Sequence, residues 1–388
     1  MLILLDKCNS GIIFYMLKFS IKMKLSKYIK ILLALLTTYF GFGLLINAQT
    51  HSTFYLGHSL INFEIPQMVS ELAKNAGTPM IYKANIGNGA NLGWHWTQPH
   101  TGQGDRWDMT LNTQVFENFI ITEAVPLKNH LQWSDTYGFL DKFYKFSIQK
   151  SPDVQLYIYE TWHCINSGTS SGCEWDNDSH IAWRTRLDQD LMQWNTMIEE
   201  HNKKNQKKAL MIPGGQGLAK LHDAIAAGEF PGFTSHRQLF SDDIHLTSIG
   251  NYFIACMMYA VLFNKSPEGL KNQLQNSFGQ PFNPAPTPQQ AQVLQKIAWE
   301  TVCAFSSLTN VDCNTSHLTN QEFDPKMYFS YPYIHCPDCK DDTVQIFNIL
   351  GQPVKNHIIG FPLNVSHFTP GVYFAKYKNG KSVTFAIP

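Results

Sequence analysis

A serine, a histidine and an aspartate stand where they could act together on a ligand. Ser59 follows Gly57 directly after an apolar, strand-like run, Thr53–Leu56. Asp242 and His245 lie three residues apart on one polar segment. A neutral hydroxyl is a weak nucleophile and needs a base such as histidine, and the histidine needs a carboxylate that fixes its tautomer. We therefore predict a catalytic triad in which Ser59 is the nucleophile, His245 the base and Asp242 the partner of the base.

Each part of this triad also has a purely structural interpretation. Ser59 taken alone is more simply the N-cap of the helix pattern that follows it, because serine is a favoured capping residue. Asp242 or Asp243 could likewise cap the helix pattern near residue 249, which would leave His245 incidental. Neither pattern is specific alone, so the prediction depends on both occurring in one chain.

The elements that must position these residues alternate between strand and helix over residues 50–265. Helix-period patterns at Ile65–Leu72, Leu187–Ile198 and Ile249–Leu262 separate the strand-like runs. This alternation predicts a parallel sheet with helices on both faces, and ligands bind such sheets at the carboxyl ends of the strands. The strand-like runs are Thr53–Leu56, Met80–Ala84, Phe116–Thr122, Val154–Glu160 and Ala209–Ile212.

A serine after the first strand and an Asp-x-x-His before the last helix together resemble the SGNH (GDSL-like) hydrolase family over roughly residues 50–270. The resemblance implies an α/β fold, a flavodoxin-like three-layer α/β/α sandwich with a parallel sheet, in a domain over residues 49–270. It also implies an oxyanion hole made by the N–H groups of Ser59 and of a glycine after the second strand. Gly89 is favoured for this glycine, with Gly87 as the alternative.

One block departs from the family pattern. After the third strand the family offers an asparagine side chain to the oxyanion, whereas this chain has Thr122 and Glu123. A carboxylate would repel the developing charge, so Thr122, or Asn129 if the loop folds back, would have to donate instead. Losing one oxyanion donor costs about 100- to 1000-fold in rate, and the third donor stays open.

The loops expected at this edge of the sheet are rich in aromatic residues. Flat indole faces suit sugar rings, and packing in the core is an equal alternative. Glu123, Glu160 and His163 follow strands and are further candidates for substrate contact, with Trp94 and Trp96. The loop tryptophans are Trp94, Trp96, Trp107, Trp133, Trp162 and Trp175.

The N-terminal segment predicts export. Four lysines between residues 22 and 30 precede the apolar run Ile31–Ile46, and Ala48 offers a small residue for cleavage. This is the layout of a signal peptide, over residues 1–48, with residues 1–22 as a possible upstream extension. A run of 16 residues is short for the roughly 20 needed to cross a bilayer. We expect a secreted or cell-surface protein with no permanent membrane span.

Composition narrows the classes of partner. Because six of the 30 basic and one of the 30 acidic residues lie before residue 49, the rest of the chain carries a net charge of about −5. A mildly acidic body without clustered Lys and Arg argues against nucleic-acid binding. The 15 histidines show no HxH or HExxH spacing, so we expect neither a metal site nor another cofactor.

Export makes the cysteines interpretable, because disulfides persist in oxidising compartments. Two pairs bracket short polar loops and are expected to close. Cys256 lies in an apolar helix pattern and is expected to be a buried free thiol. For Cys336 and Cys339, a CxxC, a structural disulfide is favoured over a redox or zinc site. The pairs expected to close are Cys164 with Cys173 and Cys303 with Cys313.

The C-terminal part changes character. Residues 271–327 are expected to be a helical and irregular connector, and residues 328–388 a small β-sandwich. The runs Val344–Val354 and Pro370–Phe374 resemble the type A sorting domain of the Bacteroidetes type IX secretion system. The resemblance implies the secretion machinery as a partner. A generic carbohydrate-binding β-sandwich is the alternative.

Together these features favour a secreted serine esterase that deacetylates polysaccharides or oligosaccharides. A lipid esterase or thioesterase is a second hypothesis, and it would call for an apolar acyl groove. A third is a glycan-binding protein without turnover, because the block at Glu123 departs from the family pattern.

Overall fold

The computed structural model divides the chain into two compact units, Met1–Cys313 and Asn314–Pro388. The predicted signal peptide lies outside the described residues, as do Cys336 and Cys339. The stretches that the structure describes are residues 51–313, 328–330, 333–335, 343–348, 352–358, 363–377 and 382–387.

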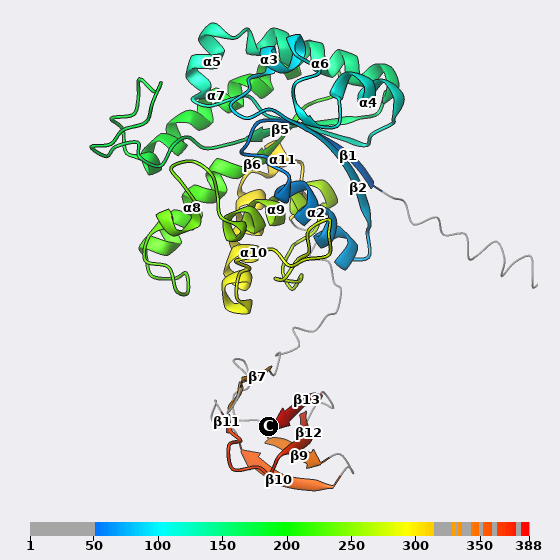
Figure 1. The fold of residues 1–388 in the computed structure, drawn as a ribbon, viewed down its shortest axis with the longest axis vertical. Coiled ribbons are helices and arrows are strands. Elements are labelled where there is room, and N and C mark those ends of the chain that lie inside the picture. Colours follow the sequence, from blue (N-terminus) through cyan, green and yellow to red (C-terminus); the bar gives the residue numbers. More distant parts are fainter. Residues whose placement is uncertain are drawn as a thin grey trace, which may run out of the picture. The chain divides into compact units, whose positions relative to one another are not determined.

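A six-stranded sheet forms the middle of the first unit (Figure 1), in the order β3-β2-β1-β4-β5-β6. All neighbouring strands are parallel except β2 and β3. The five predicted strands are confirmed. The edge strand β3 was not expected, because two residues are too few to give a pattern. The strands are β1 (His51–Gly57), β2 (Met80–Ile86), β3 (Gln103–Gly104), β4 (Asn118–Ile121), β5 (Gln155–Glu160) and β6 (Leu210–Pro213).

Helices cover both faces of this sheet, so the predicted three-layer α/β/α sandwich is confirmed (Figure 1). Two short helices, η1 (His236–Leu239) and α11 (Ser306–Thr309), complete the unit. One layer holds α3 (Leu92–Thr97), α4 (Trp107–Thr113), α5 (Leu127–Trp133), α6 (Thr136–Lys150) and α7 (Trp183–Lys204). The other holds α2 (Glu64–Asn75), α8 (Gly214–Ala226), α9 (Ser248–Phe263) and α10 (Pro288–Ala304).

The first unit is larger than the sequence predicts. Helix α10 was expected in a connector over residues 271–327, but its apolar stripe is buried in the core that α2, α8 and α9 share. Leu294, Ala298 and Val302 are 0% exposed. A capping box between Thr287 and Gln290 starts the helix. The unit therefore extends to Cys313, because a helix with one apolar face has to cover it.

The cysteine predictions for this unit are confirmed. Disulfides join Cys164 to Cys173 and Cys303 to Cys313. Cys256 is a free thiol that is fully buried in α9. Within the described residues, no helix is long and apolar enough to cross a membrane.

The described residues of the second unit form only β-strands and the turns between them, as the sequence predicts. It has a four-stranded antiparallel sheet, β10-β9-β12-β13, and a three-stranded one, β11-β8-β7. Its strands are β7 (Tyr328–Ser330), β8 (Tyr333–His335), β9 (Thr343–Asn348), β10 (Pro353–Ile358), β11 (Leu363–Asn364), β12 (Gly371–Tyr377) and β13 (Ser382–Ile387).

Candidate active site

The three predicted triad residues meet at the carboxyl edge of the sheet. Ser59 lies just after β1, a central strand, and His245 lies just before α9. His245 Nε2 is 2.8 Å from Ser59 Oγ, and His245 Nδ1 is 2.7 Å from Asp242 Oδ2. Residues 186 positions apart thus form one hydrogen-bonded chain, with the geometry that passes a proton from a hydroxyl to an imidazole.

The segment that carries Asp242 also fixes its orientation. Asp242 Oδ1 accepts the N–H groups of Ile244 at 2.8 Å and His245 at 2.7 Å, which leaves Oδ2 for the imidazole. Partial burial acts to raise the pKa of Asp242, but these hydrogen bonds and that of the His245 ring outweigh it and lower the pKa. Helix α9 has Thr247 as its N-cap, so the capping alternative for Asp242 does not apply.

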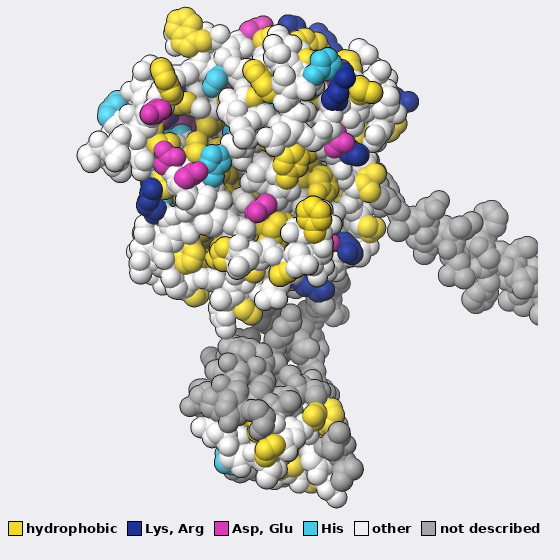
Figure 2. Space-filling model, in the orientation of Figure 1, with side chains coloured by type: hydrophobic (Ala, Val, Ile, Leu, Met, Phe, Trp, Pro, Cys, Tyr) yellow, Lys and Arg dark blue, Asp and Glu magenta, His cyan; other side chains and the backbone are white. Residues whose placement is uncertain are grey.

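The triad is open to solvent. The side chain of His245 is 41% exposed and that of Asp242 is 51% exposed. Figure 2 shows acidic and histidine side chains lying close together on one side of the first unit. A bulky molecule can therefore approach the reacting atoms without entering a buried channel.

Two backbone N–H groups expected in the oxyanion hole are unbonded. Within residues 51–313, those of Ser59 and Gly89 donate to no other protein group, whereas Gly87 N–H donates to Gly57 O at 2.9 Å. Gly89 has a φ of +66°, a left-handed conformation that glycine adopts without steric cost. The structure thus favours Gly89 over Gly87 as the second donor.

The predicted third donor is wrong. Thr122 is 0% exposed, and its hydroxyl donates to Tyr159 O at 2.8 Å. Asn129, the alternative, donates its amide to Trp175 O at 2.8 Å. Thr122 thus bonds to a carbonyl of β5 and Asn129 to a carbonyl of the loop after it, so the Thr122 hydroxyl is not free to donate to an oxyanion.

Glu123 holds the loops in place rather than contacting substrate, so its predicted role is corrected. It is 0% exposed. Its Oε1 accepts the N–H groups of Leu92 at 3.0 Å and Ala124 at 2.8 Å, and its Oε2 accepts the Thr136 hydroxyl at 2.7 Å. Burial raises the pKa of this carboxyl, and these donors oppose the rise. The side chain therefore ties the starts of α3 and α6 to the end of β4.

Glu160 and His163 are also interior residues, so their predicted contact with substrate is corrected. Glu160 is 1% exposed and accepts the Gln216 N–H at 3.1 Å, and burial raises its pKa to about 8. His163 is 2% exposed and lies 3.3 Å from Asp190, and burial lowers its pKa. The position of a residue after a strand does not say which way its side chain points, and here both point inward.

The two predicted tryptophan contacts differ in their surroundings. Trp96 stacks on Trp107 with ring centroids 5.1 Å apart and meets Phe143 edge-on, so it packs in the core. Trp94 lies against the turn that carries Gly89, since a Cβ placed on Gly87 would come within 2.6 Å of its ring. The prediction is corrected for Trp96, while Trp94 stays a candidate at the edge of the site.

Two buried histidines that were not predicted brace the turn that carries the nucleophile. His58 donates from Nε2 to Glu123 O at 3.0 Å, and its Nδ1 accepts Leu60 N–H. His95 donates from Nε2 to Gly57 O at 2.9 Å. Burial lowers the pKa of each to about 4, so both are neutral near pH 7. The adjacency of His58 to Ser59 was the one available signal.

A neutral His95 that donates from Nε2 must accept at Nδ1. Asn85 Oδ1 lies 2.9 Å from this nitrogen, and Asn85 Nδ2 has no partner among the described residues. We therefore exchange the amide oxygen and nitrogen of Asn85, so that its NH2 group faces His95 and donates to Nδ1.

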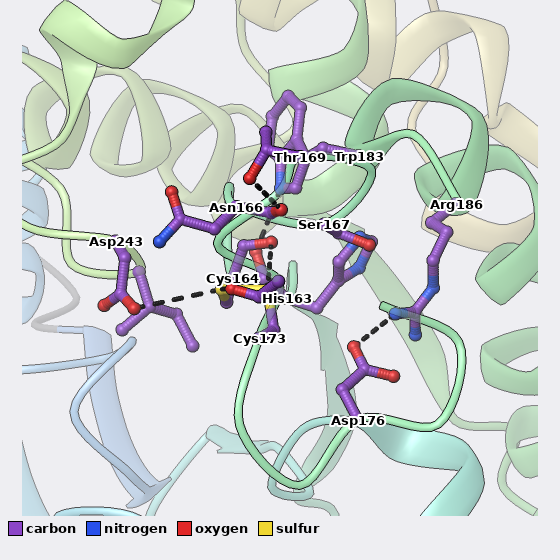
Figure 3. The surroundings of a disulfide bond; sticks show 12 residues. His163, Cys164, Asn166, Ser167, Thr169, Cys173, Asp176, Trp183, Arg186 and Asp243 are labelled. Atoms are coloured by element: carbon purple, nitrogen blue, oxygen red, sulfur yellow. Dashed lines mark hydrogen bonds and ion pairs between the residues drawn. A yellow bond between two sulfur atoms is a disulfide. The ribbon is translucent and has the colours of Figure 1, made fainter. Parts of the chain in front are cut away.

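The loop after β5 supports the segment that carries the base. Trp162 is 1% exposed, and its indole N–H donates to Ile244 O at 2.7 Å. Ile165 N–H donates to Asp243 O at 2.7 Å. Figure 3 shows Asp243 beside the disulfide that closes this loop. Both carbonyls lie directly before His245 in the chain, so the loop fixes the backbone that leads into the base.

The C-terminal residues identify how the chain leaves the cell. Residues 330–386 match the family described as "Secretion system C-terminal sorting domain". This stretch is a sorting domain. It marks the protein for secretion or for the cell surface, as the sequence predicts, and it implies an interaction with the secretion machinery.

Several solved structures are similar to this chain, while no curated protein matches it. A DUF4886 family protein from Bacteroides uniformis is 15% identical with a TM-score of 0.47, over 68% of this chain and 100% of the other. A putative GDSL-like lipase from Parabacteroides merdae is 13% identical with a TM-score of 0.37, over 54% and 94%. Phospholipase A1 from Streptomyces albidoflavus is 15% identical with a TM-score of 0.32, over 52% and 94%.

Proposed function

We propose that this chain is a secreted serine esterase that removes acetyl groups from glycans. The observation that carries the proposal is the hydrogen-bonded chain of Ser59, His245 and Asp242 beside unbonded N–H groups. This set of groups is what acyl transfer from an ester requires.

In the first step, Ser59 Oγ attacks the ester carbonyl carbon while His245 Nε2 takes the hydroxyl proton. The N–H groups of Ser59 and Gly89 stabilise the negative oxygen of the tetrahedral intermediate. The carbon–oxygen bond to the sugar then breaks, and His245 returns the proton to the leaving sugar oxygen. Water, activated by the same histidine, hydrolyses the acetyl-serine and frees acetate.

A small acyl group on a large alcohol suits this site. The exposed fractions of His245 and Asp242 leave room for a bulky leaving group. The space behind the nucleophile turn is filled, because a Cβ on Gly57 would come within 2.5 Å of Thr122 and 2.8 Å of Ile61. A long acyl chain would need an apolar groove instead.

Ser59→Ala tests the proposal. We expect the rate of acetate release from acetylated glucomannan to fall by about 1000-fold or more, since the nucleophile is lost. Ser70→Ala is the matched control, because Ser70 lies on α2 and bonds to Met80 O. Acetate release that persists in Ser59→Ala would refute the triad.

Two further outcomes would favour the alternative functions. A preference for nitrophenyl esters of eight carbons or more would indicate a lipid esterase. Glycan binding without turnover would indicate a non-catalytic protein.

A further inference from the structure

Two tryptophans of the first unit stand almost fully in solvent. The exposed fraction is 78% for Trp133, the last residue of α5, and 87% for Trp175, on the loop after β5. Trp175 also has a φ of +58°, a backbone conformation that bulky side chains seldom adopt. Such backbone outliers persist only where the surroundings impose them, and they gather at ligand sites.

The backbone around Trp175 is held on both sides. The Cys164–Cys173 disulfide closes the loop just before it. Asp176, just after it, is 3% exposed and pairs with the buried guanidinium of Arg186 (Figure 3). The Asp176 side chain thus anchors the loop in the interior, while the Trp175 side chain is exposed.

The same loop is joined to α5. Asn129 on α5 donates its amide to Trp175 O at 2.8 Å, and Lys128 pairs with Asp178 at 2.7 Å. Because α5 ends in Trp133, both exposed indoles belong to one connected rim. We call this rim, made of α5 and residues 173–178, the aromatic rim.

The aromatic rim is tied to both halves of the candidate site. On one side, Asn91 donates its amide to Ser134 Oγ at 3.2 Å, which links the loop of Gly89 to the end of α5. On the other side, Ile165 N–H donates to Asp243 O, which links the same loop as Trp175 to the base segment. A molecule lying across Ser59 and His245 therefore has this rim along one side.

The charge beside the rim selects among glycans. Glu174, Asp242 and Asp243 are exposed, and the nearby Lys128 is already paired with Asp178. A surface with this excess of carboxylates repels a polyanion. A polymer of uronic acids is thus disfavoured, and an uncharged chain is not.

We propose that Trp133 and Trp175 form a binding subsite that stacks against sugar rings of an uncharged, acetylated glycan held across Ser59. The proposal rests on the esterase function proposed above. Aromatic faces give apolar contact area at little conformational cost, while the exposed side chains of Gln132, Glu174 and Asn177 on the rim can bond to hydroxyls. The subsite binds the chain, and the triad acts on its ester.

The test compares a polymer with a small ester. Trp133→Ala and Trp175→Asn remove the indoles, and asparagine is chosen because it tolerates the left-handed backbone. For acetylated glucomannan, we expect each variant to raise KM about 10-fold and the double variant more. For nitrophenyl acetate, kcat/KM should stay as in the parent. Phe278→Ala is the matched control, since Phe278 is 86% exposed on the loop between α9 and α10.

Binding separates this proposal from the esterase proposal. In a Ser59→Ala background, deacetylated glucomannan should still bind by calorimetry, and the double tryptophan change should abolish that heat. Binding that depends on the two tryptophans supports the subsite, whatever the activity of the enzyme. A parent enzyme that fails to hydrolyse nitrophenyl acetate would count against the esterase proposal and not against the subsite. Unchanged polymer KM and binding in the double variant would overturn the subsite. Equal kcat/KM for acetylated polygalacturonate and glucomannan would overturn its preference for uncharged chains.

Discussion

Buried polar side chains hold the turn that carries Ser59, although they are not themselves exposed at the site. His95 bonds to Gly57 O, and His58 and Glu123 connect the turn to the end of β4. Neutral histidines suit this task, because they donate and accept without bringing a charge beneath the nucleophile. Their protonation is therefore coupled to the stability of the turn.

This coupling predicts how stability depends on pH. Burial lowers the pKa of His95 from 6.5 to about 4. Between these values the unfolded chain binds more protons than the folded one, so the free energy of unfolding falls as pH drops from about 6.5 to about 4. His95→Gln keeps a donor for Gly57 O but does not titrate. We expect it to lessen this fall by up to about 1.4 kcal/mol per pH unit.

Urea denaturation of the parent and of His95→Gln at pH 7, 5.5 and 4.5 measures the effect. The other buried histidines titrate in both proteins, so only the difference in slope reports on residue 95. Parallel losses of stability in the two proteins would contradict the assignment of His95 as a neutral brace.

At the residue scale, the sequence predicts the triad better than its surroundings. The meeting of Ser59, Asp242 and His245 could be predicted, because the order of elements along the chain places strand ends and the last loop at one edge of the sheet. Glu123, Glu160 and His163 lie just as close to strand ends along the chain. Their side chains point inward, which depends on tertiary packing that a single sequence does not encode locally.

At the scale of elements, the candidate site depends on a contact between two loops. The segment 241–247 carries the base, and the segment 161–165 supports it through two hydrogen bonds to its carbonyls. The base segment is closed on itself by the bond from Ser241 N–H to His245 O, but neither loop contains a helix or a strand of the sheet. The rate should therefore respond to a change at Trp162, which touches no reacting atom.

Trp162→Phe tests this support. The ring stays in place, but the hydrogen bond to Ile244 O is lost, so the backbone of the base segment is held less firmly. We expect kcat for nitrophenyl acetate to fall about 10-fold with KM unchanged, because misplacement of a catalytic group lowers the rate rather than substrate binding.

Trp183→Phe is the matched control. Trp183 is also buried, and its indole donates to His163 O at 2.9 Å in the same loop rather than to the base segment. Equal kcat losses in the two variants would show that Trp162 acts through general stability and not by positioning His245.

Strands β1, β2, β4, β5 and β6 and helices α2, α7 and α9 were predictable because their apolar periods are strong. The extent of the first unit was not, because the Pro- and Gln-rich stretch before α10 has the composition of a linker. Only the burial of Leu294 and its neighbours against α9 shows that this helix belongs to the core.

At the scale of the whole molecule, the chain separates chemistry from export. The first unit holds the candidate site, and residues 330–386 of the second are the sorting domain. We expect a chain that ends at Cys313 to hydrolyse nitrophenyl acetate with kcat/KM within about twofold of the full chain, since each unit has its own core. In the native host, the shortened protein should fail to reach the cell surface or the medium.

Activity assays on the purified proteins and fractionation of the cells measure these two outcomes separately. A shortened chain that folds but loses most of its activity would show that the second unit contributes to the site. A shortened chain that still reaches the surface would show that residues 314–388 are not needed for export.

The spacing of the cysteines has a consequence for the order of folding events. The two disulfides join cysteines only 9 and 10 residues apart, and loops of about 10 residues close within about 100 ns. Cys256, the one cysteine of residues 51–313 that lies outside the two disulfides, becomes buried once α9 packs. Each partner is thus the nearest thiol along the chain. The ring of residues 164–173, just before Trp175, can be covalently closed as soon as an oxidant is met, with little reshuffling and before the sheet is complete.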